Sequence, residues 1–234
     1  MRRIHQFTYW IADAQCSGTI NGFPILETGL AGGSGGAPLD AYLIGKDNVL
    51  RLEILRAGEA PRVRMEVRAM DPGDLCDPCG LPDARLPDSI PGAIERRFDS
   101  ETDHFARILA RAAPSDALAM VAFGMRLRDA FRAGNAQALR SFFRPKIEVI
   151  AALMEAPAAA IEASLGTMLG EFEESDLRFG PEDLEALPHC GGKVWEIRRK
   201  DRRPLLDAPD PEGNGHRSLQ VFAADLGGGP AIVA

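Results

Sequence analysis

The sequence predicts an α+β protein with an antiparallel β-sandwich over residues 1–98 and a second α+β domain over residues 99–234. Two observations lead to this fold class. Apolar residues alternate with polar ones up to about residue 70, as in half-buried strands, and from about residue 100 they repeat with helical spacing. Because helices and strands occupy separate stretches, a doubly wound sheet, which needs them to alternate, is excluded.

The composition is that of a globular protein, with 45% hydrophobic and 26% charged residues in a chain of 234. The net charge is 27 − 34 = −7, which argues against general nucleic-acid binding because a positive field is needed to displace counterions from phosphates. No apolar run approaches the roughly 20 residues of a membrane-spanning helix. The first residues lack a signal-peptide cleavage site, and four cysteines are too few for a disulfide scaffold. We therefore expect a cytoplasmic protein with no nucleic-acid or membrane partner.

The first strands are predicted from alternation and turn residues. Residues 1–11 are expected to form a strand, and Asn21-Gly22 predicts a type I′ turn because both positions need φ > 0. Pro24 cannot donate to a ladder, so its strand is expected at a sheet edge. Two more strands, residues 48–56 and 62–70, are expected to form a hairpin whose loop is residues 57–61.

Residues 71–99 are rich in proline and glycine and are predicted to be a connector. Helical spacing starts near Phe105 and continues in three segments. Ser115 is the expected N-cap of the segment that Gly134 ends, and Asn135 is the expected N-cap of the next, where Pro145 predicts a kink or a restart. The last segment spans residues 157–174.

Strands return after residue 190, in four short stretches. Residues 193–199 are the first of these, and Trp195 within them is expected in the core. The others are residues 204–207, 216–224 and 230–234. No internal repeat links the two halves.

The second half resembles a known family in its element order. Residues 128–143, with Gly134-Asn135 between two helices, and the closing residues 220–233 are similar to the SnoaL-like or NTF2-like family. The resemblance implies a curved sheet and helices around a conical cavity, with pairing of two chains through the sheet. That family includes both enzymes and non-catalytic binders, so the fold does not fix the function.

The first half resembles jelly-roll domains found beside glycosidases, on the pattern of residues 20–25 and 39–54. This resemblance implies a β-sandwich shape, and sugar binding is not carried over from it.

Cys76 and Cys79 form the sharpest local motif, a Cys-x-x-Cys followed by Gly80. A zinc site needs two more ligands, for which only His189-Cys190 and Cys16 are candidates. A redox pair needs a helix start after the motif, which Gly80-Leu81-Pro82 prevents. We predict a loop turn, with no metal and no cofactor.

Other glycine and arginine clusters have ordinary structural interpretations. Residues 29–36 are glycine-rich but lack the Gly-Lys-[Ser/Thr] ending of a phosphate loop, so a flexible connector is expected. The charged turn over residues 198–203 is expected to be solvated, with an anion site as the lesser alternative. A solvated sheet face is likewise expected from a group of arginines and glutamates, namely Arg51, Arg62, Arg64, Arg68, Glu53 and Glu66.

The residues available for acid–base chemistry do not form a motif. The four histidines (His5, His104, His189 and His216) are far apart and lack metallohydrolase spacing, and no Gly-x-Ser-x-Gly elbow is present. A hidden acid or base would have to come from Asp103, His104, Glu196 or His216. The sequence assigns no catalytic and no binding residue.

These observations favour a non-catalytic binding or assembly protein that forms a homodimer through its C-terminal sheet and takes a small molecule or a protein as ligand. The alternative is a cavity enzyme of the isomerase or dehydratase type, with one buried acid or base in the C-terminal cone. A cone filled by Phe123, Phe142, Phe143 and Phe172 would argue against that enzyme.

Overall fold

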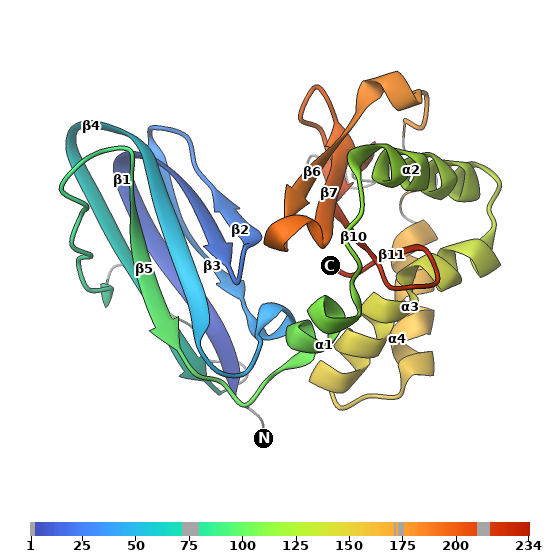
Figure 1. Cartoon of the computed structure of the whole chain (residues 1–234), viewed down its shortest axis with the longest axis horizontal. Coiled ribbons are helices and arrows are strands. Elements are labelled where there is room, and N and C mark those ends of the chain that lie inside the picture. The colour runs from blue at the N-terminus through green and yellow to red at the C-terminus, as the bar shows by residue number, and fades with distance from the viewer. Residues whose placement is uncertain (1–2, 72–79, 171, 173–175, 210–215) are drawn as a thin grey trace. The chain divides into compact units, whose positions relative to one another are not determined.

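The computed structural model describes residues 3–71, 80–170, 172, 176–209 and 216–234 (Figure 1). The chain divides into two compact units, Met1–Arg107 and Ile108–Ala234. The described residues form helices and antiparallel sheets, which confirms the predicted α+β class.

The division falls later than the expected boundary at residues 98 and 99, within helix α1 (His104–Arg111). Phe105, at the start of α1, is fully buried. Its ring packs edge-on against Phe23 and Tyr42, with centroid distances of 5.8 and 6.2 Å. The first turn of α1 therefore belongs to the core of the first unit.

The first unit contains one five-stranded antiparallel sheet in the order β2-β1-β4-β5, with β3 also paired to β1. Strands β1 and β4 lie side by side along their length (Figure 1). Asn21 and Gly22 have φ of 53° and 79°, so the predicted turn between β1 and β2 is confirmed, as is the edge position of β2. The strands are β1 (Ile4–Ile20), β2 (Phe23–Glu27), β3 (Gly32–Pro38), β4 (Asn48–Met70) and β5 (Gly92–Phe98).

The predicted hairpin over residues 48–70 is wrong. These residues form the single strand β4, and both of its halves pair with β1 rather than with each other. The inward-facing residues change parity along each strand: Phe7 and Ile11 are followed by Ala14 and Cys16 in β1. In β4 the even-numbered Leu50, Leu52 and Ile54 are followed by the odd-numbered Val63 and Met65.

Asp13 is the residue where this change occurs. The register jumps from Ala12↔Arg62 to Ala14↔Ala57, which leaves Asp13 opposite residues 58–61. Asp13 has φ of 52°, and its carboxylate accepts a hydrogen bond from the Ala60 N–H at 2.7 Å. Buried positions are an odd number of residues apart across the bulge, from Ile11 to Ala14 and from Ile54 to Val63, so apolar side chains are buried on both sides of it.

Two stretches expected to be connectors are strands instead. The glycine-rich β3 pairs with residues 6–12 of β1. A Cβ at Gly35 would lie 3.0 Å from the Tyr9 hydroxyl oxygen, so the missing side chain leaves room for Tyr9. Residues 92–98 form β5, which is an edge strand and so tolerates the flanking prolines.

The described residues of the second unit form three further α-helices, a four-stranded antiparallel sheet in the order β11-β10-β7-β6, and the pair β8-β9. Helix α2 packs on β6 and β7, whereas α3 contacts both β11 and α4. The helices are α2 (Ala117–Arg132), α3 (Ala136–Leu153) and α4 (Ala158–Gly170). The strands are β6 (Leu184–His189), β7 (Val194–Arg199), β8 (Leu206–Pro209), β9 (His216–Leu219), β10 (Val221–Asp225) and β11 (Pro230–Ile232).

The local predictions for this unit are confirmed in part. Asn135 caps α3 by accepting from the Ala138 N–H, but Asp116 rather than Ser115 caps α2. Helix α3 continues through Pro145. Strand β6 lies before residue 190, where no strand was predicted. It contains Pro188, which an edge strand accommodates.

Aromatic side chains fill the core of the second unit. Phe123 and Phe143 are fully buried, and Phe172 is nearly so. Phe142 packs edge-on against Phe123 at a centroid distance of 5.2 Å. Trp195 is buried in the same core, as predicted.

We predict that the bulge at Asp13 is energetically coupled to Gly58. A Cβ at Gly58 would lie 1.8 Å from the Asp13 carboxylate, so Gly58→Ala is expected to lower the free energy of unfolding by about 1–3 kcal/mol. Asp13→Gly removes the close contact with a Cβ at residue 58 and places glycine at the positive φ. It also removes the carboxylate that accepts the Ala60 N–H. Urea unfolding of both single variants and the double variant measures the coupling. If the two substitutions change the free energy of unfolding additively, the proposal that the bulge at Asp13 determines the register is contradicted.

Candidate functional site

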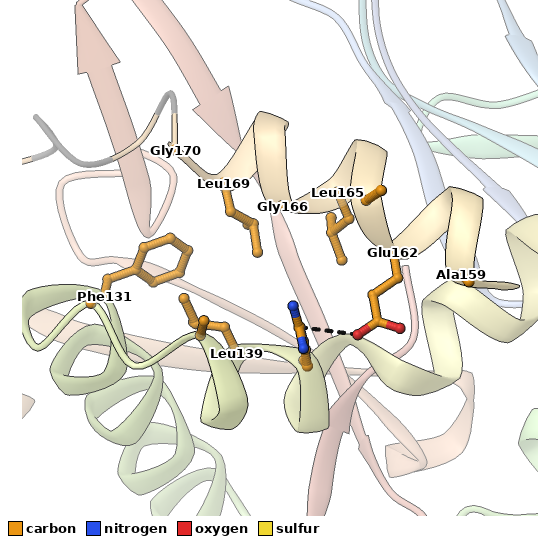
Figure 2. Close-up of a pocket in the computed structure, with 12 residues that line it drawn as sticks. Phe131, Leu139, Ala159, Glu162, Leu165, Gly166, Leu169 and Gly170 are labelled. Carbon is orange, nitrogen blue, oxygen red and sulfur yellow. Dashed lines mark ion pairs between the residues drawn. The ribbon is translucent and has the colours of Figure 1, made fainter.

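An elongated groove of about 490 Å³ lies between α3 and α4 of the second unit (Figure 2). Leu165 and Leu169 reach into it from α4, and Leu139 faces them from α3. Phe131, at the end of α2, lies near Gly170, whereas Glu162 lies near Ala159. The volume is in the range of ordinary small-molecule sites.

Small residues form much of the groove wall. A Cβ built at Gly166 or Gly170 would have no atom within 4 Å, so this wall of α4 is open. Helix α4 carries a single charged residue, Glu162, although most of its residues are exposed. An exposed helix with so few charges is unusual for a protein surface. The small lining residues are Gly134, Ala136, Ala159, Ala163, Gly166 and Gly170.

One ion pair crosses the groove. Arg140 Nε of α3 lies 3.0 Å from Glu162 Oε1 of α4, and the side chains are 68% and 37% exposed. A pair this exposed contributes little to stability. Because its charges cancel, it leaves the groove neutral and predominantly apolar. Apart from this pair, the described lining residues are apolar, so the groove is suited to binding an apolar molecule.

A polar pocket of about 310 Å³ lies elsewhere in the same unit, beside the 3-10 helix η3 (Pro181–Asp183). Charged side chains of both signs line it. The Arg178 side chain and backbone both bond to Asp176, and they hold the pKa of Asp176 below its usual range. Arg203 lowers the pKa of Asp201 in the same way. Both carboxylates are therefore ionised at neutral pH.

The charged turn over residues 198–203 is more than a solvated turn. Arg198 Nε lies 2.7 Å from Glu185 Oε1. Arg199, however, is buried, with its guanidinium 4.7 Å from the centroid of the Phe179 ring. The sequence pattern does not indicate this burial, since Phe179 is far from Arg199 in the sequence.

Glu196, one of the candidate acids, lies beside His189, which the sequence offered only as a possible zinc ligand. His189 Nε2 lies 3.8 Å from Glu196 Oε2, and these side chains are 19% and 14% exposed. His189 also packs edge-on against Phe222. Asp103 pairs instead with Arg107 at 2.9 Å, while His104 and His216 begin α1 and β9.

His5 belongs to a separate cluster in the first unit. Its ring nitrogen Nδ1 lies 3.2 Å from Asp40 Oδ1, and its backbone N–H donates to the other carboxylate oxygen at 2.7 Å. Asp40 also accepts from the Thr102 hydroxyl. These bonds fix the segment after β3 onto β1.

The arginine face of the first sheet carries exposed ion pairs, as expected of a solvated surface, and the pair of Arg51 with Glu95 joins two strands. Arg51 bonds to Glu53 and Glu95 at 3.0 and 2.7 Å. Arg64 pairs with Asp83, Arg68 pairs with Glu66, and Arg62 is exposed.

Cys76 and Cys79 lie outside the described residues, so their predicted turn stays a prediction. Among the residues that the structure describes, no three His, Cys, Asp or Glu side chains gather in a group fit to hold a metal ion. No helix in the same part of the chain is long and apolar enough to cross a membrane.

Comparison with known proteins identifies no relative: no family model, no curated protein and no solved structure matches the chain.

We predict that Cys16 and Cys190 are unreactive at neutral pH. Burial raises the pKa of Cys16 from 9.0 to about 11 and that of Cys190 to about 12. Since the thiolate is the nucleophile, alkylation by iodoacetamide at pH 8 is expected to be at least about tenfold slower in the folded chain than in urea. A chain with Cys76→Ser and Cys79→Ser isolates the two thiols.

The same pKa shifts fix the direction of a pH effect on stability. Below about pH 9 both thiols are neutral in the folded and unfolded chains. Above it the unfolded chain ionises first, so their contribution to the free energy of unfolding falls toward pH 11–12. Rapid labelling of the folded chain at pH 8 would contradict this assignment.

Proposed function

We propose that this chain is a non-catalytic binding protein whose second unit holds a small apolar molecule in the groove between α3 and α4. The observation that carries the proposal is the combination of large apolar side chains facing one another with an open wall of alanine and glycine. Burial of a ligand against Leu139, Leu165 and Leu169 supplies the binding free energy, at about 25 cal/mol per Å² of apolar surface. The opposite charges of Arg140 and Glu162 cancel, so this pair does not favour an anionic or a cationic ligand.

The packing of the core favours binding over the cavity-enzyme alternative. Phe123 and Phe143 occupy the interior in which a catalytic cone would need open space. Glu196 and its neighbour His189, 3.8 Å apart, are not among the described lining residues of the groove or of the polar pocket. An enzyme of the isomerase or dehydratase type would need its acid or base to face a cavity.

The proposal includes the sandwich, the NTF2-like cone and the homodimer. The change of register at Asp13 supports a sandwich, because the two halves of β1 pair with different further strands, residues 6–12 with β3 and residues 17–20 with β2. The α2 and α3 contacts with the four-stranded sheet support the cone. The edge strands β6 and β11 offer backbone groups for pairing with a second copy.

We predict that Gly166→Trp weakens binding in the groove at least about tenfold while the chain stays folded. The site of the new Cβ is open, and tryptophan has a better helix propensity than glycine. Titration with the neutral dye Nile red is expected to show saturable fluorescence for the natural sequence and affinity at least about tenfold lower for the variant.

Ala160→Trp is the matched control, because Ala160 is an exposed residue of α4 that does not line the groove. Its dye affinity is expected to equal that of the natural chain. Equal affinity in both tryptophan variants, or no saturable binding in the natural chain, would contradict the proposal.

We predict a homodimer at micromolar concentration, measured by light scattering after gel filtration. Isologous pairing of edge strands gives closed two-fold symmetry, the commonest arrangement of soluble oligomers. A mass that stays at 25.2 kDa across the concentration series would refute the dimer.

A further inference from the structure

The polar pocket beside η3 contains a buried cation with an unused donor. The Arg199 side chain is 5% exposed. Its Nη2 donates to the Asp176 backbone oxygen, and its Nη1 lies 4.0 Å from the Asp176 carboxylate. The Nε is buried and has no hydrogen-bond partner among the residues that the structure describes. A guanidinium has five N–H donors, and a buried donor left unpaired is costly.

Phe179 holds this guanidinium in place. The Arg199 guanidinium lies over the Phe179 ring at 4.7 Å, and that of Arg128 lies over the same ring at 5.7 Å. Arg128 also donates to the Phe179 backbone oxygen. The pocket therefore has a cation in a defined position, which is what recognition of a small anionic group needs.

The remaining charges at the pocket are partly paired. Arg178 Nε lies 3.0 Å from Asp176, and Arg203 Nε lies 2.7 Å from Asp201. Among the described residues, two lining side chains of opposite sign, Glu182 and Lys200, have no hydrogen bond or ion pair. Both are exposed. The pocket thus offers donors at Arg199 and Lys200 and an acceptor at Glu182.

We propose that this pocket binds a small zwitterion, of which a free α-amino acid is the simplest. The carboxylate of the ligand lies toward Arg199 and Lys200, and its ammonium group pairs with Glu182. A simple anion is disfavoured because four carboxylates also line the pocket, at Asp176, Glu182, Asp183 and Asp201. A volume of about 310 Å³ accommodates a molecule of this size. The pocket shares no lining residue with the apolar groove, so this inference does not rest on the proposed function.

The test is a chemical-shift titration of the full chain at low salt with L-alanine, acetate and ethylamine as separate probes. Saturable shifts of the arginine Nε–H resonances are expected with L-alanine, at an affinity at least about tenfold higher than for either singly charged probe. Acetate binding as tightly as L-alanine would reduce the site to an anion site and overturn the proposal, as would the absence of saturable shifts with L-alanine.

Variants at the exposed rim keep the test independent of folding. Lys200→Ala and Glu182→Gln are each expected to weaken L-alanine binding by about tenfold. Arg202→Ala removes an exposed cation of the same turn that does not line the pocket, and its affinity is expected to be unchanged. If all three variants bind L-alanine equally, the ligand lies elsewhere and the assignment fails.

Discussion

The second unit depends on the close approach of α2 to its sheet at Gly124. A Cβ at this position would lie 2.9 Å from Ile197 Cγ2 and 3.2 Å from Leu184 Cδ1. Glycine inside a helix costs about 1 kcal/mol relative to alanine, and here that cost is offset by closer packing on β6 and β7. Because α2 lies so near the sheet, Phe123 is buried in the core, and Phe131 at its end lines the groove.

Features set by neighbouring residues were predictable from the sequence. The Asn21-Gly22 turn follows from the φ values that a type I′ turn requires, and the Asn135 cap follows from its oxygen reaching the Ala138 N–H. The pairing of β4 was not predictable in this way. Residues 57–61 contain the glycine and proline of a loop, but the bond that fixes their register comes from Asp13, which is 47 residues from Ala60. A local pattern carries no information about such a partner.

In the candidate sites, too, local features are visible in the sequence and tertiary contacts are not. The low charge of α4 is visible in the sequence and marks a helix that is unusual for an exposed surface. The position of α3 beside it, which makes the groove, is not visible. Arg199 has the sequence context of a charged turn, and its burial depends on Phe179 and Asp176, which pack against it only in the folded chain. Only tertiary structure separates this arginine from Arg198 and Arg203.

The groove and the polar pocket, both in the second unit, differ in the interaction that would hold a ligand: apolar burial in the groove and charge attraction in the pocket. Binding in the groove depends on apolar area removed from water, which added salt does not weaken. Binding at Arg199, as proposed, depends on attraction between charges. Salt screens this attraction strongly above about 0.1 M, where the Debye length is about 10 Å. A buried guanidinium is less screened than the exposed Lys200 and Glu182, so salt weakens the rim contacts of a zwitterion first. The two proposed sites therefore differ in their response to ionic strength: the first is selective through shape and the second through the placement of charge.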